Sequence, residues 1–141
     1  MKVKIIKLCC EAKLPVIASK FSVGFDLYSV QEVIIPSKER RLISTGIAME
    51  IPYEYELQIR PRSGLAVKHG LTVLNSPGTI DPDYRGELKI LLINTGSNYY
   101  KVSVGDRIAQ GVFNKIVRPY FQEVKKLTPT ERNEKGFGST G

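Results

Sequence analysis

Five short segments of this chain combine glycine with arginine, aspartate, serine or glutamine, residue types that bind phosphate groups or activate water. The segments are Gly24–Tyr28, Arg60–Ala66, Gly78–Gly86, Gly105–Gln110 and Arg132–Gly141. In the second segment, Arg62, Ser63 and Gly64 stand where a predicted strand leads into a predicted helical turn. Backbone N–H groups, a hydroxyl and a guanidinium can therefore converge there on phosphate oxygens. This composition predicts a site for a phosphorylated ligand.

The residues from Leu74 to Ile80 are predicted to form a hairpin whose polar groups could pair with the edge of a pyrimidine base. Backbone N–H and C=O groups near Gly78, together with the Asn75 amide, can pair with the edge of uracil, which presents an acceptor, a donor and an acceptor. Cytosine reverses two of these three groups and would leave buried groups unpaired, at a cost of about 1–3 kcal/mol each. A 5-methyl group would clash with a tight hairpin. A hairpin of this kind could therefore distinguish uracil from cytosine and thymine.

In their order and spacing, the five segments resemble the five motifs of the trimeric deoxyuridine triphosphatases (dUTPases), and the resemblance spans almost the whole chain. It implies Mg²⁺-dependent hydrolysis of dUTP to dUMP and pyrophosphate. This reaction limits the incorporation of uracil into DNA and supplies dUMP for dTMP synthesis. The resemblance also implies a homotrimer in which each active site is shared between subunits.

The same resemblance assigns catalytic roles to individual residues. Asp81 would orient and deprotonate the water that attacks the α-phosphorus, and Gln110 would place an amide near that phosphorus. Arg62, Ser63 and Gly64 would grip the α- and β-phosphates. Asp26 would hold Mg²⁺ through water, which suits an ion that keeps most of its hydration shell and binds mainly to phosphates. Phosphoryl transfer depends on positioning and charge neutralisation, so no nucleophilic side chain is required.

The resemblance further implies how the sugar and the outer phosphates are bound. Tyr84 would lie under the deoxyribose, where a 2′-hydroxyl would have to go. Residues 125–141 contain few strongly apolar side chains, which predicts a mobile tail behind a single domain of residues 1–124. When the tail closes over the site, Phe137 would stack on uracil and Arg132 would meet the γ-phosphate. Gly138, Ser139 and Thr140 would donate hydrogen bonds to the phosphate chain.

Two residues depart from the usual pattern of that family. Asn133 follows Arg132 where glycine is common, but asparagine tolerates a left-handed backbone better than most residues. Gly111 follows Gln110 where a larger apolar residue is more usual, which affects the expected packing and not the chemistry.

Strand patterns dominate the segments that must position these residues. Tyr53–Arg60 alternates apolar and polar residues without a break, which indicates a half-buried strand. Further short strands are predicted between turn sequences, at Val3–Leu8, Val33–Ile35, Arg41–Ser44, Leu71–Leu74, Leu88–Ile93, Tyr99–Val104, Ile108–Val117 and Tyr120–Val124. We expect an all-β fold, a jelly-roll-like β-clip barrel or sandwich. One helical turn is predicted over residues 64–68, with Ser63 as its N-cap and Gly70 as its end.

Composition limits the kinds of ligand and the cellular compartments to be expected. The net charge of +7, from 21 Lys and Arg against 14 Asp and Glu, favours a polyanionic partner. Neither a zinc-finger spacing nor an aromatic RNA-binding signature nor a basic run is present, so we expect a nucleotide and not nucleic acid. Adjacent Cys9 and Cys10 suit a reducing compartment. The N-terminus is interrupted by lysines and no apolar run approaches about 20 residues, so we expect a cytoplasmic enzyme without membrane contact.

Two other functions have to be weighed against hydrolysis of dUTP. The dCTP deaminases share the general fold, but their catalytic glutamate precedes an asparagine by three residues, and Leu91 stands at that position before Asn94. A β-rich scaffold that has lost activity would lack one of the key residues, and Asp81, Arg62, Gln110 and the tail aromatic are all present. We expect His69 to be structural, and Asp83 and Asp106 to form turns.

Overall fold

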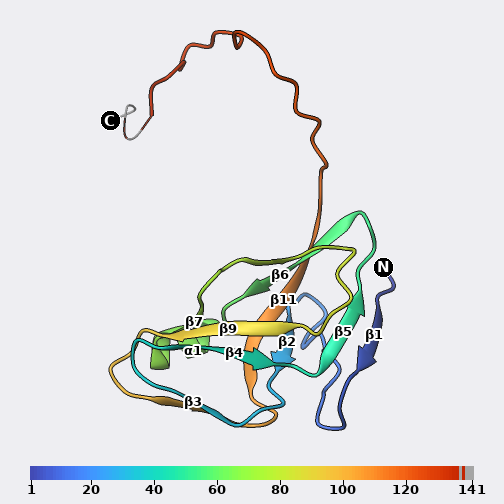
Figure 1. Cartoon of the computed structure of the whole chain (residues 1–141), viewed down its shortest axis with the longest axis vertical. Coiled ribbons are helices and arrows are strands. Elements are labelled where there is room, and N and C mark those ends of the chain that lie inside the picture. The colour runs from blue at the N-terminus through green and yellow to red at the C-terminus, as the bar shows by residue number, and fades with distance from the viewer. Residues whose placement is uncertain (137, 139–141) are drawn as a thin grey trace.

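Short strands make up nearly all of the regular structure in residues 1–136 and 138, the part of the chain that the computed structural model describes (Figure 1). The strands are β1 (Lys4–Lys7), β2 (Phe25–Tyr28), β3 (Val33–Ile35), β4 (Arg40–Ser44), β5 (Ile47–Glu50), β6 (Tyr55–Arg60), β7 (Leu71–Val73), β8 (Gly78–Ile80), β9 (Lys89–Asn94), β10 (Tyr100–Val102) and β11 (Arg107–Lys115). A single short helix, α1 (Ser63–His69), is described. The predicted all-β class is therefore confirmed.

The strands form four small antiparallel sheets that pack around one apolar core. The largest has the order β2-β11-β6-β8, and a second has the order β4-β9-β7, while β1 pairs with β5 and β3 pairs with β10. In β6, Leu57 and Ile59 are buried as the alternating sequence predicts, because successive side chains of a strand point to opposite faces. The sheets resemble a sandwich and do not close into a barrel.

Most of the predicted strands are confirmed to within a few residues, but the last one is wrong. No strand is assigned over Tyr120–Val124, and the side chains of Tyr120 and Phe121 are 91% and 86% exposed. After β11 the chain leaves the body as an extended arm, so its apolar residues have no strand of the same chain to pair with (Figure 1). The sequence pattern indicated local strand character, but a strand also needs a neighbour.

The helix that follows β6 begins one residue earlier than predicted. Its N-cap is Arg62, with φ −92° and ψ 126° and no side-chain capping bond, so Ser63 is the first helical residue and the assignment of Ser63 as N-cap is wrong. Gly70 ends the helix as predicted, in the left-handed conformation at φ 66°.

The unusual glycine after Gln110 has a packing explanation. Gly111 is buried in β11, and a Cβ atom there would lie 2.6 Å from Cε2 of Phe25. The Phe25 ring therefore fills the volume that a larger side chain at position 111 would occupy.

Within the described residues, no helix is long and apolar enough to cross a membrane.

Candidate active site

An ion-paired cluster lies at one edge of the four-stranded sheet, where β2 and β11 meet the chain that enters α1. The Asp26 carboxylate accepts from Arg62 Nε at 2.9 Å and from Arg107 Nη1 at 3.3 Å. The side chains of Asp26 and Arg62 are only 18% and 25% exposed, so this pair is shielded more than an ordinary surface salt bridge. Arg62 Nη1 also donates to the Arg107 carbonyl at 3.4 Å. Asp26 thus fixes the direction of two guanidinium groups.

Gln110 joins this cluster through the register of the sheet. Its Cα pairs with Asp26 on one side and with Arg60 on the other. Its Nε2 donates to the Pro61 carbonyl at 2.9 Å. A Cβ atom at Gly24 would lie 2.7 Å from Gln110 Oε1, so glycine at position 24 leaves the space that the amide occupies. The first, second and fourth glycine-containing segments are therefore brought together in one chain.

Ser63 and Gly64 complete the cluster at the first turn of α1. Both residues are exposed, and a Cβ atom at Gly64 would have no heavy atom within 4 Å. The backbone beside Arg62 is therefore open to a ligand from solvent. Cationic side chains and free N–H groups at one place provide what an anionic phosphate chain requires.

A second group of predicted residues surrounds a cavity of about 290 Å³ next to β8. The cavity is lined by Leu42, Thr79, Ile80, Asp81, Tyr84, Glu87 and Lys89. Asp81 and Tyr84 are thus brought together, with Asp81 exposed at the end of β8. Asn75 and Gly78 lie beside each other in the preceding hairpin, since a Cβ atom at Gly78 would be 3.3 Å from Asn75 Nδ2. Neither of these two residues lines the cavity itself.

The two groups lie at opposite edges of the same sheet. Asp26 is on β2 and Asp81 directly follows β8, and the order β2-β11-β6-β8 places three interstrand spacings between them, about 14 Å in total. Ile80 pairs with Leu57, whereas Gln110 pairs with Arg60, so the groups are also offset along β6 by about 10 Å. One chain therefore does not bring Asp81 within hydrogen-bonding reach of the Asp26 cluster.

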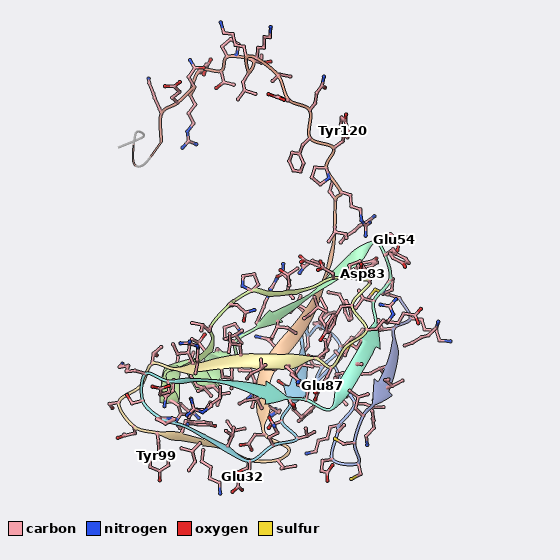
Figure 2. The ribbon with its side chains drawn as sticks, in the orientation of Figure 1. Glu32, Glu54, Asp83, Glu87, Tyr99 and Tyr120 are labelled. Carbon is pink, nitrogen blue, oxygen red and sulfur yellow. The ribbon has the colours of Figure 1, made fainter. Side chains whose placement is uncertain are left out.

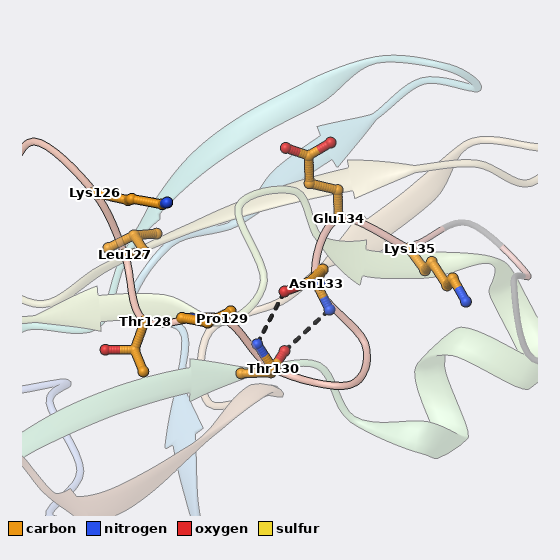
Figure 3. A pocket seen from close by; sticks show the side chains of 8 residues that line it. All are labelled: Lys126, Leu127, Thr128, Pro129, Thr130, Asn133, Glu134 and Lys135. Carbon is orange, nitrogen blue, oxygen red and sulfur yellow. Dashed lines mark hydrogen bonds between the residues drawn. The ribbon is translucent and has the colours of Figure 1, made fainter.

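The tail lies away from both groups (Figure 1). Arg132 Nε donates to the Lys135 carbonyl at 2.9 Å, a hydrogen bond within the tail itself. Asn133 has φ 44°, the left-handed conformation expected of the residue in place of the usual glycine. Figure 3 shows a hollow in this segment, across which Asn133 and Thr130 exchange two hydrogen bonds of 2.9 and 3.0 Å. The hollow is lined by tail residues alone, so it is no part of the candidate site. Gly138 is described at φ 87°, whereas the predicted ligands Phe137, Ser139 and Thr140 lie outside the described residues.

Three charged residues of these groups were not identified from the sequence. Arg107 contacts Asp26, and its place inside the Gly105–Gln110 segment was the available signal. Glu87 and Lys89 line the cavity, and the alternation of β9 was a signal for Lys89 alone, because Glu87 precedes that strand. His69 packs on Tyr100 with ring centroids 4.9 Å apart, in agreement with a structural role. Asp106 accepts from Ser103 N–H at 2.8 Å and so forms the turn expected of it.

The described residues contain no group of three or more His, Cys, Asp or Glu side chains that could hold a metal ion directly. Asp26 is a single carboxylate whose two oxygens already meet Arg62 and Arg107. A carboxylate oxygen has more than one lone pair, so Asp26 can still accept from a water molecule of a hydrated ion. The site therefore fits a cation that is bound mainly by the substrate phosphates. It does not fit a cation that is held by protein ligands on all sides.

Comparisons with known proteins agree with this geometry. The family model described as dUTPase matches residues 10–141. The chain is 55% identical over 141 residues to the deoxyuridine 5′-triphosphate nucleotidohydrolase of Nautilia profundicola, covering 100% of this chain and 99% of that protein. It is 54% identical over 138 residues to the protein of the same name from Clostridioides difficile, covering 98% and 96%. Among solved structures, the dUTPase of Staphylococcus bacteriophage 80alpha with dUPNHPP matches with a TM-score of 0.92 and 28% identity, covering 99% of this chain and 98% of that one.

Proposed function

The chain belongs to the dUTPase family and hydrolyses dUTP to dUMP and pyrophosphate, and we propose that Asp81 activates the attacking water. Asp81 is exposed at the end of β8 and borders the cavity next to the pyrimidine-reading hairpin. Its carboxylate would accept a proton from the water as the water oxygen bonds to the α-phosphorus. The bond from that phosphorus to its bridging oxygen then breaks, and pyrophosphate leaves. The reaction uses the protein for positioning and proton transfer, and no side chain is modified.

The Asp26 cluster is proposed to hold the phosphates. Arg62 presents a guanidinium whose direction is fixed by Asp26, and Arg107 adds a second positive charge. Because these groups are already ordered, they can stabilise the charge that develops on the phosphate oxygens without reorganising during the reaction. Ser63 and Gly64 would donate from the open end of α1, and the Gln110 amide would do so beside the attacked phosphorus.

Selection of the substrate is assigned to the hairpin and to Tyr84. Asn75 and the backbone near Gly78 would pair with uracil, and the Tyr84 ring, which lines the cavity, would occupy the space that a 2′-hydroxyl requires. Uncompensated burial of the wrong hydrogen-bonding groups is the physical basis of such discrimination.

We propose Mg²⁺ as the metal, bound mainly to the phosphates and contacted by Asp26 through water. The ion would neutralise phosphate charge when bound. The fit rests on the single carboxylate of Asp26 in a basic cluster, which can accept from a coordinated water molecule but cannot replace several of them.

We propose a homotrimer in which each site takes Asp81 from one subunit and the Asp26, Arg62 and Gln110 cluster from a second. The separation of these groups at opposite edges of the sheet supports this arrangement, since one dUTP molecule must meet both. The arm begins at Ile116, which lines a further cavity of about 640 Å³ together with Asp81, yet the arm runs away from its own body (Figure 1). Each site would therefore be closed by the tail, residues 125–141, of the third subunit, which contributes neither Asp81 nor the Asp26 cluster to that site.

Within that closed site, Arg132, Phe137 and the donors Gly138, Ser139 and Thr140 keep their predicted roles on the phosphates and the base. A cytoplasmic location, expected from the two free cysteines and the lysine-interrupted N-terminus, belongs to the same proposal. Neither a nucleic acid nor a membrane is needed for this activity.

The alternative functions lack support in the site. Leu91, at the position of the deaminase glutamate, lies half-buried in β9 and pairs with Leu42, and its side chain cannot transfer a proton. An inactive scaffold would not need the Asp26 carboxylate to order two arginines beside an open helix end.

The deciding experiment measures pyrophosphate release from dUTP, dCTP, dTTP and UTP, each with and without Mg²⁺. We expect rapid release from dUTP in Mg²⁺ and little release from the other three nucleotides. Absence of release from dUTP in Mg²⁺ would refute the proposed activity, and equal release without the ion would refute the proposed metal.

A further inference from the structure

Glu87 lies between Tyr84 and β9, and its side chain borders the cavity that Asp81 and Tyr84 line. In Figure 2 it lies near the point where β4 leads into β5, away from Glu32. The side chain is only 22% exposed. A carboxylate withdrawn from water needs hydrogen-bond partners, because its desolvation is otherwise unfavourable.

The partners of this carboxylate come from the turn between β4 and β5. Oε1 accepts from the Gly46 N–H at 2.9 Å, and Oε2 accepts from the Ser44 hydroxyl at 3.4 Å. Lys89 Nζ lies 3.7 Å from Oε2 and adds a weaker attraction from the cavity side. The end of the Glu87 side chain is therefore anchored to a separate part of the fold.

The main chain of the same residue holds Tyr84. The Tyr84 hydroxyl donates to the Glu87 carbonyl at 3.0 Å. The next residue is fixed on both sides, since Leu88 N–H donates to the Ile47 carbonyl at 2.9 Å and the Thr45 hydroxyl donates to the Leu88 carbonyl at 2.5 Å. Glu87 thus connects the Tyr84 hydroxyl to the β4–β5 turn by two routes, one through its carboxylate and one through its backbone.

Glycine at position 86 allows the Tyr84 ring to fold back onto this carbonyl. A Cβ atom at Gly86 would lie 2.6 Å from Cζ of Tyr84, a distance that side chains do not tolerate. The ring therefore rests directly on the backbone of residue 86, and the hydroxyl contact with the Glu87 carbonyl decides where along that backbone it rests. Tyr84 as a whole is 44% exposed, so one side of the residue faces solvent.

We propose that Glu87 is a positioning residue for the exclusion of ribonucleotides. Its anchored carboxylate fixes the carbonyl that holds the Tyr84 hydroxyl, and this sets the ring where a 2′-hydroxyl would otherwise fit. The inference rests on the proposed role of Tyr84 under the sugar. It assigns to Glu87 a part in the choice between dUTP and UTP, without any contact with the substrate.

The test compares two substitutions, one that keeps the charge of Glu87 and one that keeps its length. Glu87→Asp keeps the charge but is too short to reach the Gly46 N–H, whereas Glu87→Gln keeps the length and an oxygen that can accept from it. The measured quantity is the ratio of kcat/KM for dUTP to kcat/KM for UTP. This ratio does not depend on the fraction of folded enzyme, so a purely structural loss leaves it unchanged. Glu32→Asp is the control, since that exposed carboxylate forms an ion pair with Lys101 at 3.0 Å, away from Tyr84.

We expect Glu87→Asp to lower the ratio about threefold to tenfold, the effect of losing one ordinary hydrogen bond, and Glu87→Gln and Glu32→Asp to leave it within about twofold. In a Tyr84→Ala background, Glu87→Asp should change the ratio no further, because residues that act through one contact are not additive.

Each remaining outcome has one reading. An unchanged ratio in Tyr84→Ala alone would remove Tyr84 from sugar discrimination and refute that part of the proposed function. A lowered ratio in Tyr84→Ala with no change in Glu87→Asp would refute the role of Glu87 and leave Tyr84 in place. A lowered ratio in Glu87→Gln with an unchanged ratio in Glu87→Asp would show that the charge matters and not the anchor, and would refute the role of the anchored carboxylate. A further loss in the double variant would show that Glu87 does not act through Tyr84.

Discussion

Arg62 Nε lies 2.9 Å from Oδ1 of Asp26, in a pair whose members come from segments 36 residues apart in the sequence. The pair joins β2 to the start of α1 across β11. Because Asp26 also accepts from Arg107, one carboxylate sets the direction of both arginines. The two arginines therefore form a preorganised candidate phosphate site whose geometry depends on Asp26.

Removing the charge of Asp26 should disturb both arginines at once. We expect Asp26→Asn to lower kcat/KM for dUTP about 10- to 100-fold, the usual effect of losing a residue that orients the groups around a metal or an anion. It should also raise the Mg²⁺ concentration needed for half-maximal activity. Steady-state rates over a Mg²⁺ series measure both effects. Glu32→Gln removes an exposed carboxylate that pairs with Lys101, away from the site, and should change neither value. An Mg²⁺ requirement unaltered in Asp26→Asn would separate Asp26 from the ion.

The glycine before β2 is expected to matter through Gln110. A methyl group at Gly24 would approach Gln110 Oε1 to 2.7 Å, so Gly24→Ala should push the amide away from the Pro61 carbonyl that it now contacts. We expect kcat to fall about tenfold in Gly24→Ala and in Gln110→Ala, with no further fall in the double variant, because both changes remove one positioned group. Rapid-mixing assays of pyrophosphate release measure kcat. An additive loss would mean that Gly24 serves the fold by another route.

The sequence was most informative where a local pattern carried the whole signal. The alternation in Tyr55–Arg60 predicted which side of β6 is buried, and Gly70 predicted the end of α1. The arm shows the opposite case, since the apolar residues around Tyr120 indicated a strand that needs a neighbour from outside the chain's own body. The candidate residues were predicted by type, but their division between two edges of one sheet follows only from the strand order. Glu87 gave no local signal, because its partners at positions 44 and 46 are distant in sequence.

Asp81→Asn keeps the shape of the side chain and removes the base. We expect kcat to fall about 10²–10⁴-fold, the usual contribution of a general base, while binding of dUTP is largely retained. Single-turnover rates and equilibrium binding of dUTP measure the two effects separately. The melting temperature should hardly change, because Asp81 is exposed and no described hydrogen bond uses its side chain. Activity within a few-fold of the unsubstituted enzyme would mean that another group activates the water.

Phe137→Ala tests whether the tail closes on the base. We expect binding to weaken by about 1–3 kcal/mol, the value of stacking one base on an aromatic ring. The melting temperature should stay nearly constant, since terminal segments contribute little to a core. Equilibrium binding of dUTP and thermal unfolding give the two quantities. A large fall in melting temperature would place the ring in the fold and not over the substrate.

Mixed trimers test whether one site takes residues from different subunits. The two partners are full-length Asp81→Asn and a chain truncated before Arg132, and each alone should be nearly inactive. After unfolding, equal mixing and refolding, about three-quarters of random trimers contain both chains. Each mixed trimer has one site in which a truncated chain supplies Asp81 and a full-length chain supplies the tail.

Activity should therefore recover to about a quarter of the unsubstituted sites. The recovered fraction is measured as pyrophosphate release per subunit, with the mixed composition verified by mass spectrometry of intact complexes. The physical reason is the separation described above, since the sheet holds Asp81 and the Asp26 cluster at opposite edges and the arm leads away from its own body. If Asp81 and its covering tail belonged to the same chain, no mixed trimer would contain a complete site. Absence of recovery in verified mixed trimers would therefore rule out the shared arrangement.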